Sequence, residues 1–107
     1  MILTKEEIKR QLRLEIDDTT EDDLITALGS AAESRTATYL NRNLYAGAED
    51  IQEGDDRGLV VSDDLRLAML MLVTHFYENR STTSEVEMLE TPLAYSWLVS
   101  PYRFYPQ

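Results

Sequence analysis

The chain has 107 residues, with 20 acidic and 10 basic side chains and no cysteine. This length allows one domain with a small core, and the missing cysteine excludes a disulfide framework, a thiolate metal site and a thiol nucleophile. The net charge of −10 argues against a protein that grips duplex DNA through its phosphates, because such contacts need lysine and arginine.

The first predicted helix covers residues 5–14. Thr4 and Glu7 have the spacing of a capping box, and Leu3 with Ile8 has the spacing of a hydrophobic staple. Three basic residues toward its end suit the negative pole of a helix.

The second predicted helix covers residues 21–40, with Thr20 or Asp18 as its N-cap and acidic residues in its first turn. Its alanine-rich middle would let another helix approach closely. The expected core stripe has helical spacing and consists of Leu24, Leu28, Ala31, Ala32, Arg35 and Tyr39, joined by Ile25 and Leu40.

Residues 44–61 form the least regular segment, which contains three glycines and a dense set of acids. A loop of this length in a small domain tends to be functional or mobile, and a short extended piece is expected at 59–61. Neither possible calcium-loop register fits this segment, because each places a side chain that cannot ligate at a ligand position. A solvated acidic face is the favoured interpretation.

The third predicted helix covers residues 63–79. Between Leu65 and Tyr77, ten of thirteen residues are apolar, and a helix apolar nearly all round is buried on most sides. It is therefore the centre of the domain, or a helix whose second face is covered by another subunit. His75 is the only histidine, and a packing role is favoured over metal binding or catalysis, with Glu78 as its candidate partner.

A short fourth helix is predicted at 92–99, with Thr91 as N-cap and Pro92 at its first position. Leu93, Trp97 and Leu98 form its apolar stripe. The aromatic tail, 100–107, is expected either to fold back on the core or to supply interface residues. The predicted fold class is an all-α bundle of about four helices, with a long loop and an extended C-terminal tail, in the single domain 1–107.

Acidic residues are concentrated in the middle of the chain. Residues 15–64 hold 14 acids and three bases, a net charge of −11. Such a surface serves solubility, repels an anionic molecule or docks a basic partner. The longest uninterrupted apolar stretch, Leu67 to Val73, is too short to span a membrane, and the N-terminus does not have the pattern of a signal peptide.

The stretch LRLAMLMLVTHFYENR, residues 65–80, resembles the signature helix of head–tail connector (adaptor) proteins of long-tailed phages. The matching motif is H-x-Y-E-N-R, from His75 to Arg80. Three further segments also resemble this family and occur in the same order along the chain. They are the opening at 3–18 and 22–25, the proline-started short helix that begins at 91–92, and the ending at 100–103.

The resemblance implies a structural virion protein with no catalytic residues, metal or cofactor. Its copies would form a ring, with twelve subunits on the dodecameric portal, located at the virion neck after synthesis in the host cytoplasm. The ring would extend the channel, let DNA pass without sequence-specific binding, and join the capsid to a head-closure (stopper) or tail protein. Glu78 and Arg80 would pair within or between subunits.

Two groups of residues are assigned roles on the basis of this resemblance. The acids expected to face the channel are Asp50, Glu53, Asp55 and Asp56. The residues expected at subunit or portal contacts come from the central helix and from the C-terminal region: Leu65, Met69, Leu72, Phe76, Tyr77, Glu78, Arg80, Trp97, Tyr102, Arg103, Phe104 and Tyr105.

An alternative function is an acidic helical binding module that imitates nucleic acid and blocks a basic protein. Such a module would stay monomeric and bind its partner in a salt-sensitive way, whereas connector subunits would associate through apolar contacts.

Overall fold

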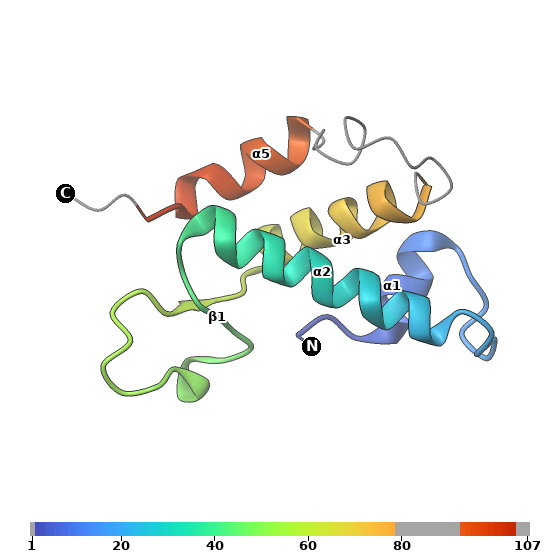
Figure 1. Cartoon of the computed structure of the whole chain (residues 1–107), viewed down its shortest axis with the longest axis horizontal. Helices are drawn as coiled ribbons and strands as arrows, with labels where there is room; N and C mark the ends of the chain where they lie inside the picture. The colour runs from blue at the N-terminus through green and yellow to red at the C-terminus, as the bar shows by residue number, and fades with distance from the viewer. Residues whose placement is uncertain (1, 79–92, 105–107) are drawn as a thin grey trace.

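The computed structural model describes residues 2–78 and 93–104, and within them four α-helices pack around one core (Figure 1). The predicted all-α bundle of about four helices is confirmed as a mostly helical fold, to which the structure adds one small two-stranded parallel sheet. No helix in the described ranges is both long and apolar enough to cross a bilayer. The helices are α1 (Lys5–Leu12), α2 (Asp22–Leu40), α3 (Asp63–Glu78) and α5 (Leu93–Val99).

Helix α3 is the centre of the subunit. It packs along α2 on one side and along α5 on another, and α1 contacts both α2 and α3 (Figure 1). Five positions on the buried side of α3 have no solvent exposure and are the largest contribution of any one helix to the core: Leu65, Ala68, Met69, Leu72 and Val73.

Helix α1 begins as the sequence predicts. The Thr4 hydroxyl accepts a hydrogen bond from the Glu7 backbone N–H, and the Glu7 carboxylate accepts one from the Thr4 backbone N–H. The helix ends at Leu12, however, two residues before the predicted end. Arg13 adopts a left-handed conformation with φ of 62° and closes the last turn through its backbone N–H. Glycine is the usual residue there, so the sequence carries no stop signal.

Helix α2 begins at Asp22, and its predicted N-cap is wrong. Glu21 occupies the cap position without a side-chain hydrogen bond. Asp18 instead accepts hydrogen bonds from the Thr20 backbone N–H, at 2.9 Å, and from its hydroxyl. These two residues therefore form a local turn before the helix, a known alternative use of such side chains.

The buried stripe of α2 also differs from the predicted one. Ala31 and Arg35 are exposed, because the helix is rotated so that small and polar positions meet α3 and α5. Gly29 and Thr36 carry no apolar signal in the sequence, so the apolar pattern predicts a stripe of their larger neighbours. The buried residues are Ile25, Gly29, Ala32, Thr36 and Leu40. The helix ends at left-handed Asn41, φ 56°.

The loop 44–61 is closed at its base by a two-stranded parallel sheet. Strand β1 (Leu44–Tyr45) pairs with β2 (Leu59–Val60), with Leu44 opposite Leu59. Extended structure was expected at 59–61, but its pairing with 44–45 was not. Between the strands lies a single 3-10 turn, η1 (Ala48–Asp50).

The C-terminal region is not an extended tail as far as residue 104. Helix α5 continues directly into the 3-10 turn η2 (Ser100–Tyr102), and the following residues return to the end of α2. The predictions for Asn79, Arg80, the Thr91–Pro92 helix start and Tyr105 fall outside the described residues.

Candidate functional site

The beginning of the C-terminal tail is part of the subunit's own fold. The Tyr102 hydroxyl donates a 2.6 Å hydrogen bond to the Asp64 carboxylate at the start of α3. The Phe104 backbone N–H donates to the Leu40 carbonyl at 2.8 Å. Of the two uses left open by the sequence, folding back on the core is therefore confirmed for residues 100–104.

One arginine holds the tail and the long loop to the end of α2. Arg42 donates to the Arg57 carbonyl from Nε at 3.0 Å, and to the Tyr102 and Gly58 carbonyls from Nη1 and Nη2 at 3.3 Å. The guanidinium of Arg57 lies 4.5 Å from the centre of the Phe104 ring, a cation–π distance. Arg42 therefore joins three segments that are distant in sequence.

The predicted contact residues of α3 differ in their exposure to solvent. Leu65, Met69 and Leu72 are fully buried. They therefore do not touch another molecule directly, and they affect a contact only by supporting the side chains that cover them. Phe76 and Tyr77 are half-buried. The Tyr77 hydroxyl donates to the Glu21 carboxylate at 2.8 Å, whereas Glu78 is exposed.

The outer face of α5, formed by Leu93 and Trp97, is the clearest uncovered apolar surface in the described ranges. The two residues are 86% and 77% exposed, and they lie one helical turn apart. The predicted apolar stripe of Leu93, Trp97 and Leu98 does not form the buried face of α5, since Leu93 and Trp97 are exposed and Leu98 is only partly buried. Tyr95 and Val99 are buried instead, and the Tyr95 hydroxyl shares a 2.7 Å hydrogen bond with that of Thr36.

A third large apolar side chain is exposed on α3. Leu67 is 47% exposed, and its neighbours Leu70 and Met71 are partly buried. Leu67 and Leu93 were not among the predicted contact residues, because an apolar residue in a continuous run gives no sign of which way it faces. The sequence predicts that α3 carries more apolar surface than one chain covers. The residues that bear on this prediction are Leu67, Leu70 and Met71.

The four acids assigned to the channel are not equivalent. Asp50, Glu53 and Asp56 are exposed, but Asp55 organises the loop. Its carboxylate accepts hydrogen bonds from the Tyr45 hydroxyl at 2.6 Å and the Asn43 amide at 3.0 Å. These donors hold the pKa of Asp55 below its usual value, and the bond raises the pKa of Tyr45.

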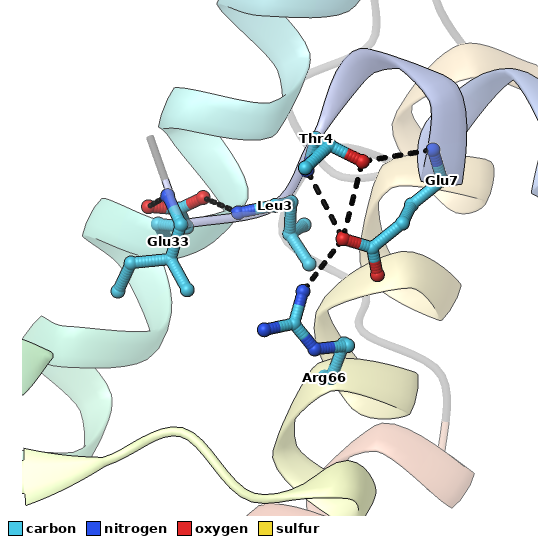
Figure 2. Close-up of polar contacts among 6 residues, drawn as sticks. Leu3, Thr4, Glu7, Glu33 and Arg66 are labelled. Atoms are coloured by element: carbon cyan, nitrogen blue, oxygen red, sulfur yellow. Dashed lines mark hydrogen bonds and ion pairs between the residues drawn. The ribbon is translucent and has the colours of Figure 1, made fainter. Parts of the chain in front are cut away.

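The N-terminal segment is tied to the two long helices, α2 and α3 (Figure 2). The Glu33 carboxylate on α2 accepts hydrogen bonds from the backbone N–H groups of Ile2 and Leu3, at 3.0 and 2.9 Å. The Glu7 carboxylate pairs with Arg66 of α3 at 2.7 Å. Burial raises the pKa of Glu7, but the Thr4 backbone N–H and Arg66 outweigh it, so the pKa lies below its usual value.

The turn between α1 and α2 is fixed by a buried lysine. Lys9 is 4% exposed, and its Nζ donates to the Ile16 and Asp18 carbonyls at 3.0 and 2.9 Å. It also pairs with the Asp22 carboxylate at 2.8 Å. The acids of this turn therefore have a fixed position, although they lie on the surface.

His75 is half-buried on α3 beside Phe76, with 6.3 Å between the ring centres. This position fits the predicted packing role better than a reactive one. Nothing in the described residues tests the proposed partnership with Glu78, which stays a prediction.

The comparisons with known proteins identify one family. The family model described as phage gp6-like head-tail connector protein matches residues 4–103. Searches of curated proteins and of solved structures gave no significant match. The family match covers every element described above and is the one that the sequence motifs led us to expect.

Proposed function

Since this chain belongs to the phage gp6-like head–tail connector family, which is structural and not enzymatic, we propose that its copies form a ring beneath the portal. In this proposal the ring extends the DNA channel and joins the capsid to a head-closure or tail protein. The observation that carries it is the family match over residues 4–103. This assignment takes precedence over the alternative of a nucleic-acid mimic.

The outer face of α5 supports a role in assembly. Leaving Leu93 and Trp97 in water forgoes about 1.5–3 kcal/mol of transfer free energy for each large apolar side chain. Tryptophan is also among the residues most enriched at binding hot spots. We assign this face, together with exposed Arg103, to the contact with the portal.

The acidic loop supports passage of DNA without binding. Asp50, Glu53 and Asp56 are exposed, and in the described residues no cation lies within 4.0 Å of their carboxylates. A channel wall of this charge repels phosphates, so DNA would slide along it while keeping its own counterions. Asp55 is left out of this role because it is bonded within the loop.

The assembly role is tested with purified subunit and purified portal. Replacing both Leu93→Ser and Trp97→Ser removes the outer face of α5 and is expected to weaken ring assembly at least about tenfold, the effect of losing a hot spot. Native mass spectrometry of the mixture measures the assembled fraction. Ala94→Ser, at another exposed position of α5, is the matched control.

If the double variant assembles as well as the wild type, α5 is not part of the contact. If the wild-type chain forms no ring with the portal, the proposed function is wrong. A truncation test needs care, because Tyr102 and Phe104 belong to the fold. Removing residues 105–107 leaves those contacts intact and asks whether the last residues bind the portal.

The channel role is tested in assembled particles. Glu53→Lys with Asp56→Lys adds cations at two exposed positions and is expected to slow DNA ejection, because phosphates then gain partners. Glu53→Gln with Asp56→Asn removes the charges without adding cations and serves as the control. Ejection at the wild-type rate from particles carrying the lysines would contradict a channel-facing loop.

A further inference from the structure

A polar pocket lies at the C-terminal end of α2. It has a volume of about 380 Å³ and is lined by Ala37, Thr38, Asn41, Arg42, Asn43 and Arg57. Two guanidinium groups therefore border one hollow, inside the most acidic segment of the chain. We call it the α2-end pocket.

The two arginines of the α2-end pocket have no acidic partner in the described part of the subunit. The ion pairs found there involve Lys5, Lys9 and Arg66 only. Arg42 is bonded to three backbone carbonyls, and Arg57 to the Asn41 side-chain oxygen at 3.3 Å. A guanidinium has five N–H donors, so both groups retain capacity for a carboxylate.

The opposite end of α2 carries the complementary charge. Glu15, Asp17 and Asp23 are exposed around the turn between α1 and α2, and no ion pair in the described residues involves them. Lys9 fixes this turn. Helix α2 has 19 residues, which separates the turn from the pocket by about 28 Å, and Figure 1 shows α2 running between the two ends.

From this arrangement we propose that the α2-end pocket of one subunit binds the acidic α1–α2 turn of the next copy of this chain. This inference rests on the proposed ring. A ring needs a heterologous contact, in which two different surfaces of the same chain meet. The acids of the loop 44–61 are less suitable occupants, since they belong to the same end of the molecule as Arg57.

The net charge of the chain also favours a second copy over a nucleic acid as the occupant of the α2-end pocket. A phosphate backbone entering the pocket would meet the exposed acids of the neighbouring loop, and a net charge of −10 repels a polyanion as a whole. A single carboxylate held at close range is less affected, because screening limits repulsion from distant charges to about a Debye length, roughly 8 Å at physiological ionic strength.

The test places a charge in the pocket without replacing either arginine. Thr38 lines the pocket and is exposed. Thr38→Glu offers the arginines an internal carboxylate and repels the incoming acid, so assembly on the portal should weaken about tenfold. Thr38→Gln has nearly the same size without the charge and should assemble like the wild type.

Reversal of the partner charge completes the experiment. Adding Asp17→Arg to Thr38→Glu should restore assembly, because the new arginine meets the new glutamate across the contact. Analytical ultracentrifugation with portal measures ring formation, and circular dichroism confirms that each variant is folded. A rescue by Glu53→Arg but not by Asp17→Arg would overturn the choice of occupant.

The remaining outcomes separate this proposal from the proposed function. If the wild type forms a ring and Thr38→Glu assembles equally well, the pocket proposal fails and the connector function stands. If the wild type forms no ring, the connector function fails first. Binding of a 20-base-pair DNA duplex that is lost in Thr38→Glu would assign the pocket to phosphate and overturn the proposal.

Discussion

Helices α1 and α5 both flank α3, but they use their side chains in opposite ways. Helix α1 buries Ile8 and Lys9, and Glu7 pairs with Arg66. Helix α5 buries Tyr95 and Val99 but leaves Leu93 and Trp97 in solvent. The difference is that α1 uses these side chains within the chain itself, whereas α5 leaves part of its apolar surface uncovered. In our proposal that uncovered surface binds another molecule.

The largest expected effect comes from truncating matched aliphatic side chains on the two helices. Ile8→Ala removes a fully buried side chain and should lower the free energy of unfolding by about 2–5 kcal/mol. Leu93→Ala removes a side chain that is 86% exposed, so the change should stay within about 0.5 kcal/mol. Urea unfolding of the monomer measures the free energy of unfolding of both variants. Equal decreases would show that α1 and α5 do not differ in how they stabilise the fold.

An intermediate effect is expected at Lys9. Lys9→Met keeps the aliphatic stem but leaves two carbonyls and the Asp22 carboxylate without their ammonium partner. We expect a loss of about 2–4 kcal/mol, near the cost of breaking a buried pair. Lys5→Met is the control, because Lys5 is half-exposed and 4.0 Å from Asp22. A loss no greater than that of Lys5→Met would show that Lys9 does not fix the turn.

The smallest effect is a pH dependence on the α1 side. The pKa of Glu7 is lowered in the folded state, so its charged form stabilises the fold above the ordinary glutamate pKa of about 4.3. This stability is lost as the pH falls through the lower folded pKa. Glu7→Gln keeps a capping side chain and should cost about 1 kcal/mol or less at pH 7.

The difference between wild type and Glu7→Gln should then shrink as the pH falls below about 4. Thermal unfolding between pH 3 and pH 7 measures it. A constant difference over this range would show that Arg66 does not act through the charge of Glu7.

Local signals in the sequence predicted local structure well. The capping box of Thr4 and Glu7 involves neighbouring residues only, so its pattern predicted the start of α1 correctly. The left-handed end at Arg13 could not be predicted, because arginine is uncommon in that conformation. The helical character of α3 was also evident from its apolar run.

Orientation around a helix axis was harder to predict than helix position. In α2 the buried face includes Gly29 and Thr36, which a search for large apolar residues overlooks. In α5 the largest apolar residue, Trp97, faces outward. Hydropathy ranks side chains by transfer free energy, but the direction each one faces depends on which helix packs beside it.

The candidate site was least accessible to sequence reasoning where distant segments meet. Arg42 joins the tail to the loop, and Asp55 is bonded to Tyr45; neither partnership has a sequence signature. The family motif identified the family, but the exposed faces to which we assign assembly are apparent only from the packing of the helices.

The parallel pair of β1 and β2 has a practical consequence for labelling experiments. Because Leu44 is paired with Leu59, the chain leaves the helical body and returns to it at adjacent points. Gly54, with φ of 87°, has open space where a Cβ would lie, so a short epitope grafted there would lengthen the loop without moving α2 or α3. An antibody against that epitope, imaged on intact particles, would show which side of the neck the loop occupies.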